Sequence, residues 1–547
     1  MSSHTASRSL RGCFILVLAS ALALALAGCD DDCPTCDPTA PDFQIPGTVY
    51  LRSQTDVDAI AGVTEISDGL QIGASDDIVD LMPLRSLRRV GSLRIMGNQA
   101  LKSLAGLDSL DVLGQLDITD NDSLETLAGL RPEISATTVD IAINWLLRDL
   151  TGCPSLPLAT VLYLDGRPDQ GEPTLSLAGL GATPVVEHLV LAVVKDLDGL
   201  GQPADRPALE RLHIEKCAGL EDLSVLSFFS SLETLEIYDN DGLETLGTLD
   251  GLTSLRNLEI MGNPDLADLG TIATLPALEW LEVGDNPLLA DFTGLPDISG
   301  VTHLGIARNS GLTSLDGLGA LPLLDQLYLY QLPALTSLAG VTDLSGLRRL
   351  DLSYLYVETL AGLPALPALE SLRLYTCPQL TSLAGLPGLD AVTNLEIGGC
   401  PLLTDLTGMP NLPALHDLDI GNLTGLTTTA GLCALTDTCR VVLTNLPALT
   451  SLVGLTGVAA LDELQISGCG ALTDLTGLAS LVRIDENLRI TSNAALADVG
   501  ALGGLTDIGD AYITFAYNPV LDQCVLWDMV SDWECRQLAV AGNGPCQ

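Results

Sequence analysis

Basic side chains are scarce in this chain of 547 residues. Only 24 lysines and arginines stand against 70 aspartates and glutamates, which gives a formal net charge of −46, and only three of the basic residues are lysines. Such a chain repels phosphate backbones, which excludes nucleic-acid binding, and anionic lipid does not attract it electrostatically. The acidic surface either keeps a leucine-rich chain soluble or attracts cations and basic partners.

Aromatic residues and catalytic motifs are also scarce. Aromatics make up 4% of the chain although 47% is hydrophobic, so the core must consist of leucine, alanine and valine. No G-x-S-x-G, H-E-x-x-H or Walker glycine loop occurs. His188 and His213, with Glu215 and Glu236 nearby, offer one conceivable metal cluster, but isolated surface histidines are the simpler interpretation. We expect no enzyme activity, no cofactor and no metal site.

What the chain does contain is a repeat with a period of 23 residues. The segments LEIYDN, LEIMGN, LEVGDN and LGIARN begin at Leu235, Leu258, Leu281 and Leu304. The pattern x-L-x-[ILV]-x-x-N runs through 20 units, and its first core residue, usually leucine, is called the marker here. The markers lie at residues 70, 93, 116, 139, 162, 189, 212, 235, 258, 281, 304, 327, 350, 372, 395, 418, 441, 464, 488 and 513. A period of this length indicates stacked units that contact only their neighbours.

Within a unit, the marker and the residue two positions later are apolar, while the residues beside them are mixed. This period of two predicts a strand with one buried face. The segment that follows is too short and too rich in glycine for a stable helix, which favours 3-10 turns or irregular extended structure. We therefore predict a strand-dominated α/β solenoid, with a parallel concave sheet and returns on the convex side.

The residue five positions after the marker carries a family resemblance. It is Asn at 98, 121, 144, 240, 263, 286, 309, 493 and 518, and Cys at 217, 377, 400 and 469. This resembles the leucine-rich repeat family, in which an inward amide bonds backbone groups of neighbouring turns. The central units resemble internalin-type repeats, and the outer ones, at 60–72, 90–95 and 484–490, resemble receptor L-domain repeats, in which a second short strand precedes the main one. The resemblance implies a leucine-rich repeat solenoid of about 20 units of 23 residues, with this ladder interrupted where Leu stands at 332, 355, 423 and 446.

The ladder also bears on calcium. The DND runs at 120–122 and 239–241 look like fragments of calcium loops, but their central asparagines are ladder residues. Weak calcium binding by so acidic a surface stays open.

The amino terminus predicts export. Two arginines and an apolar stretch precede Leu26-Ala27-Gly28-Cys29, which resembles the lipobox of bacterial lipoproteins. The resemblance implies that residues 1–28 are a signal peptide and that Cys29 carries acyl chains; an ordinary secretory signal is the alternative. We expect a protein anchored to a bacterial cell membrane through lipid alone, on a leaflet left open. Residues 29–47 then form an acidic tether.

An open stack exposes its core, so caps are expected at both ends of the solenoid, which we place at residues 70–520. Residues 48–69 are the expected N-terminal cap. Residues 521–547 are the expected C-terminal cap, with an amphipathic helix over 525–538 that breaks the repeat. Export permits disulfides. Cys433 and Cys439 flank one return and could pair, and among Cys524, Cys535 and Cys546 we favour a Cys524–Cys546 bridge.

The solvent-facing strand positions suggest a binding face between the units that start at 235 and 372. An acidic row comes first and is followed by aromatic and arginine residues, the types that dominate binding hot spots. The row is Glu236, Glu259 and Glu282, and the others are Trp280, Tyr328, Tyr330, Arg373 and Tyr375. We predict that this face binds a protein or glycan partner. A solvated sheet is the plainer interpretation, and for the whole protein the alternative is a non-catalytic spacer or scaffold of the cell envelope.

Overall fold

The computed structural model describes residues 43–547 except 167, 170–171, 174, 202, 218, 273–274, 433–438, 509, 532, 534 and 547. The signal sequence, Cys29 and residues 29–42 of the tether lie outside the described residues. The chain forms two compact units, Met1–Gly219 (unit 1) and Leu220–Gln547 (unit 2). In the described part, no helix has the length and apolar character needed to cross a membrane.

The strands of unit 1 pair in parallel, each with the next marker strand along the chain. Markers face markers across the sheet, as Leu93 faces Leu116 and Val139 faces Leu162. The paired strands are β2 (Thr48–Leu51), β3 (Glu65–Ser75), β4 (Arg89–Asn98), β6 (Gln115–Thr119), β7 (Thr138–Ala142), β8 (Val161–Asp165), β11 (His188–Ala192) and β12 (Arg211–Glu215). Short strands β1 (Gln44–Ile45) and β5 (Asp111–Val112) pair with β3 and β4, and β9 (Pro168–Asp169) pairs with β10 (Glu172–Pro173).

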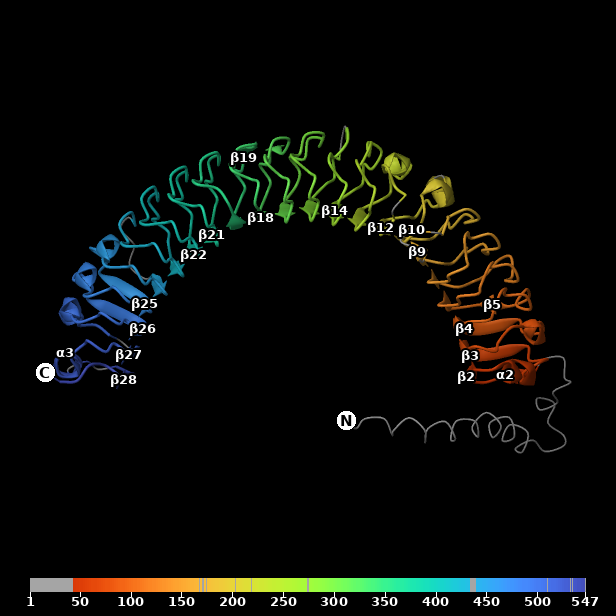
Figure 1. Cartoon of the computed structure of the whole chain (residues 1–547), viewed down its shortest axis with the longest axis horizontal. Helices are drawn as coiled ribbons and strands as arrows, with labels where there is room; N and C mark the ends of the chain where they lie inside the picture. Colours follow the sequence, from red (N-terminus) through yellow and green to blue (C-terminus); the bar gives the residue numbers. More distant parts are fainter. Residues whose placement is uncertain are drawn as a thin grey trace, which may run out of the picture. The chain divides into compact units, whose positions relative to one another are not determined.

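Unit 2 repeats the same arrangement. Its strands are β13 (Thr234–Tyr238), β14 (Asn257–Met261), β15 (Trp280–Gly284), β16 (His303–Ala307), β18 (Gln326–Leu332), β20 (Arg349–Leu355), β21 (Ser371–Tyr375), β22 (Asn394–Gly398), β23 (Asp417–Gly421), β24 (Arg440–Thr444), β25 (Ala460–Ser467), β26 (Arg483–Thr491), β27 (Tyr512–Ala516) and β28 (Gln537–Ala541). Within each unit the strands line the inner edge and the returns line the outer edge (Figure 1). The predicted fold class, a strand-dominated solenoid with a parallel sheet, is confirmed.

The core lies between the strands and the returns. Leu235 and Ile237, the marker and the residue two positions later, are fully buried, and the return leucines join them. Several returns contain 3-10 turns, as their leucine spacing predicts: η1 (Met82–Leu84), η2 (Asp198–Leu200), η3 (Pro203–Asp205), η4 (Ser224–Phe228), η5 (Val453–Leu455), η6 (Thr476–Leu478) and η7 (Gly500–Gly504). A small parallel pair, β17 (Gly319–Ala320) and β19 (Val341–Asp343), also lies in the returns. Gly340 shows why glycine recurs there, because a Cβ on it would lie 2.4 Å from the Leu315 carbonyl carbon.

The asparagine ladder is present as the sequence predicts. The side chain of Asn286 donates to the carbonyls of Ile260 and Gly284, at 2.9 and 2.8 Å. Its Oδ1 accepts from the backbone N–H and the side-chain amide of Asn263, at 3.0 and 3.2 Å. Asn286 therefore bonds backbone groups of its own turn and of the preceding turn, among them the buried N–H of Asn263.

At two of the four leucine ladder sites the strand itself is longer. β18 and β20 are seven residues long, against five for their neighbours. They end at Leu332 and Leu355, and these two residues also pair with each other, so direct strand pairing satisfies backbone groups that a leucine side chain cannot bond. β23 and β24, which precede Leu423 and Leu446, keep five residues.

The C-terminal expectation needs correction. The predicted helix over 525–538 is only α3 (Gln523–Val530), and the chain then forms β28, which pairs in register with β27. Asn543 continues the ladder, accepting from the side chain of Asn518 at 3.1 Å and donating to the Phe515 carbonyl at 2.9 Å. The repeat therefore continues one turn beyond the 20 marked units. At the other end, β2 and α2 (Gln54–Ala59) supply the strand and short helix expected of the N-terminal cap.

The outer units also differ in detail from the strand arrangement that their resemblance to receptor L-domain repeats predicts. The second short strand expected before the main strand is in part fused with it, because β3 runs continuously over 11 residues. A register shift between Ile66 and Gly69 marks the join in its pairing with β4. The fused strand bends there and still presents one buried face.

The residue four positions after the marker adopts positive φ in every unit except at Gly166, and Val193 does so at 53°. A β-branched residue is strained there. We expect Val193→Gly to raise the free energy of unfolding of unit 1 by about 1 kcal/mol, measured by urea denaturation. Gly97 occupies the equivalent site with φ of 69°, and a Cβ there would meet nothing closer than 3.6 Å. Gly97→Val should therefore cost stability through φ alone, and a neutral result in both variants would contradict the strain.

Candidate binding face

The acidic row lies in register on the first three strands of unit 2. Glu236 faces Glu259, and Glu259 faces Glu282. The Tyr238 hydroxyl donates to the Glu259 carboxylate. Burial and then the charge of Glu259 raise the pKa of Glu282. Burial and the hydrogen bond to Glu259 likewise raise the pKa of the Tyr238 phenol. Glu259 and Glu282 therefore stand as like charges on adjacent strands.

Elsewhere on this sheet, arginines bridge the carboxylates of the two flanking strands. Arg373 contacts Asp351 at 3.4 Å and Glu396 at 3.2 Å. Arg440 contacts Asp417 at 2.8 Å and Glu463 at 3.2 Å in the same manner. In the acidic row the central position is occupied by Glu259 instead of arginine. In the acidic row, a carboxylate therefore stands at the central position that an arginine occupies in the other two clusters.

Trp280 begins β15 at the edge of the acidic row. Its ring stacks on that of His303 on the next strand, with centroids 4.7 Å apart and an interplanar angle of 19°. The indole nitrogen is buried and has no hydrogen-bond partner. One face of the indole is therefore already covered by this chain.

The tyrosines form a packed strip on β18 to β21. Tyr330 and Tyr354 meet edge to face at 5.2 Å between centroids, and Tyr354 meets Tyr375 at 6.4 Å. The guanidinium of Arg373 lies 4.9 Å from the Tyr375 ring centroid. The Tyr328 hydroxyl donates to Gln326 Oε1 at 2.9 Å, which restrains the ring of Tyr328 beside the strip.

Two aromatic residues of this region are absent from the predicted set. Tyr354 links Tyr330 to Tyr375, although it occupies the positive-φ site, which is not one of the sheet-facing positions. Tyr356 follows it and is 43% exposed. Their signal in the sequence is the clustering of five tyrosines between residues 328 and 375.

One strand separates the acidic row from the tyrosines. β16 presents only Gly305 and Ala307 between Glu282 and Gly284 on one side and Tyr328 and Tyr330 on the other. Strands are spaced about 4.8 Å apart, so the Glu259 and Tyr328 backbones are about 14 Å apart. All eight predicted residues therefore share one face of unit 2. They form two groups, Glu236, Glu259, Glu282 with Trp280, and Tyr328, Tyr330, Arg373 with Tyr375.

Unit 1 carries a second set of acids on its strand side. Asp117 is only 7% exposed; its Oδ2 is 2.7 Å from Arg94 Nε, while its Oδ1 is buried with no hydrogen-bond partner. Asp140 is its register partner, and burial together with the charge of Asp117 raises its pKa. Burial, followed by the charges of Glu215 and Asp140, raises the pKa of Asp165 to about 6.

The raised pKa of Asp165 makes the stability of unit 1 depend on pH. In the unfolded chain this carboxyl has its ordinary pKa of 3.8. The folded state gains stability from the protonated form below that value and loses it as pH rises through about 6. The side chain is partly solvated, so we expect Asp165→Asn to stabilise unit 1 by about 1 kcal/mol more at pH 8 than at pH 5. Urea denaturation at both pH values measures this, and an equal effect at both would contradict the raised pKa.

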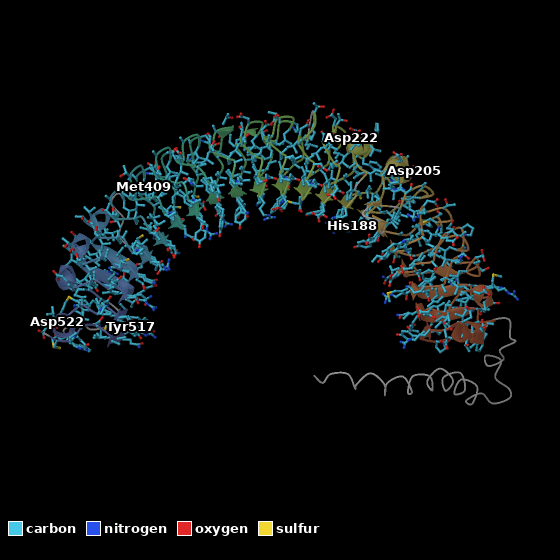
Figure 2. The ribbon with its side chains drawn as sticks, in the orientation of Figure 1. His188, Asp205, Asp222, Met409, Tyr517 and Asp522 are labelled. Carbon is cyan, nitrogen blue, oxygen red and sulfur yellow. A yellow bond between two sulfur atoms is a disulfide. The ribbon has the colours of Figure 1, made fainter. Side chains whose placement is uncertain are left out.

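Each of the two histidines singled out in the sequence has another neighbour. His188 lies edge-on to Tyr163 at 5.9 Å, and His213 Nε2 is 3.4 Å from Glu215 Oε2. His188 is on the strand side of unit 1, whereas Asp205 is on the return side (Figure 2). Across residues 43–547 as described, three metal-type ligands gather only at Asp522, Cys524 and Cys546, where the two sulfurs are joined in a disulfide. Asn121 and Asn240, the centres of the two DND runs, belong to the ladder.

In the part of the chain that the structure describes, the cysteines are either disulfide-bonded or free thiols. Cys524 and Cys546 form the disulfide that the sequence favoured. Cys439 is a free thiol, and burial raises its pKa to about 12; its expected partner Cys433 lies outside the described residues. The ladder cysteines are buried free thiols that donate to backbone carbonyls, as Cys377 does to Leu352 at 3.5 Å.

Comparison with known proteins adds three solved structures. An internalin from Listeria monocytogenes is 17% identical, covering 62% of this chain and 89% of its own, with a TM-score of 0.27. A TLR13–ssRNA13 complex gives 16% identity over 91% of this chain and 83% of its own, with a TM-score of 0.29. An LRR protein of Leptospira interrogans gives 14% identity over 73% and 90%, with a TM-score of 0.32.

No family model matches the chain, and no curated protein does. The fold class therefore rests on the strand register and the asparagine ladder of this chain itself.

Proposed function

We propose that this protein binds a polypeptide partner through the strand side of unit 2 from β13 to β21, called the binding face below. The observation that carries the proposal is the pair Glu259 and Glu282 on adjacent strands, which face each other across the sheet beside a strip of partly exposed tyrosines. Elsewhere the sheet pairs carboxylates with its own arginines, whereas these two carboxylates keep negative charge for an external cation. Aromatic residues next to such charge supply the apolar contact that anchors protein interfaces.

The packing of the aromatics favours a polypeptide over a glycan. Sugars stack on open ring faces, but Trp280 is covered on one face by His303, and the tyrosines of the strip meet edge to face. The exposed tyrosines combine apolar ring surface with hydroxyls, which suits the mixed apolar and hydrogen-bonding contacts of a protein surface. The net charge of −46 further favours a basic partner segment.

We propose that the protein is exported and held at a bacterial membrane by acyl chains on Cys29. The support is the lipobox-like sequence that ends at Cys29. Replacing Cys29 by alanine should move the protein from the membrane fraction to the soluble fraction and abolish labelling by an alkyne fatty acid, because the anchor is the lipid alone. An unlabelled wild-type protein, or a variant that stays in membranes, would contradict the anchor.

The binding proposal is tested by capture from envelope extract and culture medium on the immobilised full-length protein. We expect one stoichiometric protein partner, lost when Trp280, Tyr328 and Tyr330 are replaced together by alanine. Retention of the partner by that variant would overturn the assignment to the binding face. Binding to a glycan array without a protein partner would favour the glycan. Absence of any ligand, with an envelope defect on deletion, would favour the spacer.

A further inference from the structure

The strand β16 carries the least side-chain volume of the binding face. Gly305 stands between Glu282 and Tyr328, and Ala307 stands between Gly284 and Tyr330. Gly305 does not have the positive φ that would require glycine, and a Cβ there would lie 3.3 Å from Glu282 Cγ, the flexible part of a side chain. The backbone therefore does not demand glycine at this position. We call the space over Gly305, between Glu282 and Tyr328, the β16 gap.

The chain shows elsewhere what fills such a position. Arg373 lies between two acidic strands, contacts Asp351 and Glu396, and places its guanidinium over Tyr375. Arg308, just beyond β16, donates two hydrogen bonds to Asp285, from Nε to Oδ1 at 2.8 Å and from Nη2 to Oδ2 at 2.6 Å. A guanidinium beside a carboxylate and a tyrosine is thus the arrangement that this sheet makes with its own residues. The β16 gap has the carboxylate and the tyrosine but no arginine.

We propose that the β16 gap receives an arginine side chain of the partner, whose guanidinium pairs with Glu282 and stacks on the ring of Tyr328. The inference rests on the proposed function and names the chemical group that the binding face recognises. Tyr328 is exposed, and its hydroxyl is held by Gln326, so its ring is positioned before the partner arrives. The guanidinium would occupy the place that Arg373 fills between its own neighbours.

The position of the Glu282 carboxylate favours the same occupant. A Cβ on Gly305 would lie 3.7 Å from Glu282 Oε1, so the carboxylate borders the β16 gap. Burial and the charge of Glu259 raise the pKa of Glu282. A cation beside Glu282 would relieve this unfavourable charge.

Arginine fits better than lysine or a metal ion. A planar guanidinium both pairs with a carboxylate and stacks on an aromatic ring, whereas an ammonium does only the first as a point charge. The carboxylates of the row do not converge closely enough to form a metal-ligand group within the described part of the chain. The gap lies between the Glu282 carboxylate and the Tyr328 ring, and a single planar cation can contact both.

The test is selection of random twelve-residue peptides on the full-length protein, kept in detergent throughout, followed by affinity measurement with synthetic peptides. We expect the selected peptides to share an arginine, and its replacement by citrulline to weaken binding at least about tenfold. Replacement by lysine should weaken binding less than citrulline does, because the charge remains. Glu282→Gln should also cost at least about tenfold.

Gly305→Arg is the sharpest variant because it fills the gap from within the chain. It should fold with an unchanged circular dichroism spectrum and bind the selected peptides at least about tenfold more weakly. Thr514→Arg is its matched control. It makes the same charge change at the same sheet position on β27, far along unit 2, and should alter affinity less than about twofold. The control separates the site from the general attraction of basic peptides to an acidic protein.

Equal binding by Gly305→Arg and Thr514→Arg would overturn the arginine site, as would peptides that tolerate citrulline. If the natural partner is lost on the Trp280, Tyr328 and Tyr330 variant but tolerates Gly305→Arg, the arginine site is wrong and the binding face stands. If no partner depends on those aromatics, the proposed function itself fails.

Discussion

Replacing Asn286 by alanine lowers the free energy of unfolding of unit 2 by about 4 kcal/mol, on the expectation set by its hydrogen bonds. The amide satisfies the carbonyls of Ile260 and Gly284 and accepts from two donors of Asn263. Alanine would remove these four hydrogen bonds at a fully buried position. Each bond contributes about 1 kcal/mol, which makes this the largest single-residue effect that we expect.

Urea denaturation of the variant measures this loss, and hydrogen exchange at β14 and β15 shows whether the solenoid opens locally. Asn543→Ala is the matched control. Asn543 makes a similar set of bonds, but it is half-buried at the last turn, where water replaces the lost partners. Its cost should be about 1 kcal/mol. Equal losses of unfolding free energy at the two sites would show that burial does not determine how much a ladder asparagine stabilises the fold.

The second large effect concerns binding. The Trp280, Tyr328 and Tyr330 triple alanine variant should bind the captured partner at least about a hundredfold more weakly, because buried aromatic anchors each contribute about 2 kcal/mol or more. All three lie on the solvent side of strands whose core faces are formed by other residues, such as Leu281 and Leu329. The fold should therefore remain.

Calorimetry with purified partner measures the affinity of the triple variant. Its control replaces one tryptophan and two tyrosines that are exposed near the C-terminal end of unit 2: Tyr512, Tyr517 and Trp527. Figure 2 shows Tyr517 on the strand side at that end and Asp522 on the return side. The control should keep wild-type affinity. Comparable losses in both triples would mean that general apolar surface, and not the binding face, holds the partner.

The repeat made most of the fold predictable. Alternating apolar residues every 23 positions determine one strand per turn, because only one side of each strand can face the core. The asparagine ladder followed from the same register. The last turn was missed although Leu538, Val540 and Asn543 repeat the pattern, because the helix spacing of the preceding segment obscured it.

The site was predictable only in part. The acidic row, the four aromatic positions and the arginine position follow from register alone, since residues at the same offset become neighbours. The stacking of Trp280 on His303 could not be predicted, because it depends on side-chain rotation. Tyr354 was missed because its positive φ turns it away from the positions that alternation counts.

The most direct test of the binding face is side-chain footprinting of the full-length protein with and without its partner. Carbodiimide labels carboxylates, and hydroxyl radicals label tyrosines. The account predicts that the partner protects Glu282, Tyr328 and Tyr354, and leaves Tyr517 and Asp528 labelled as before. Protection confined to the returns or to the C-terminal end, with Glu282 and Tyr328 unchanged, would contradict it.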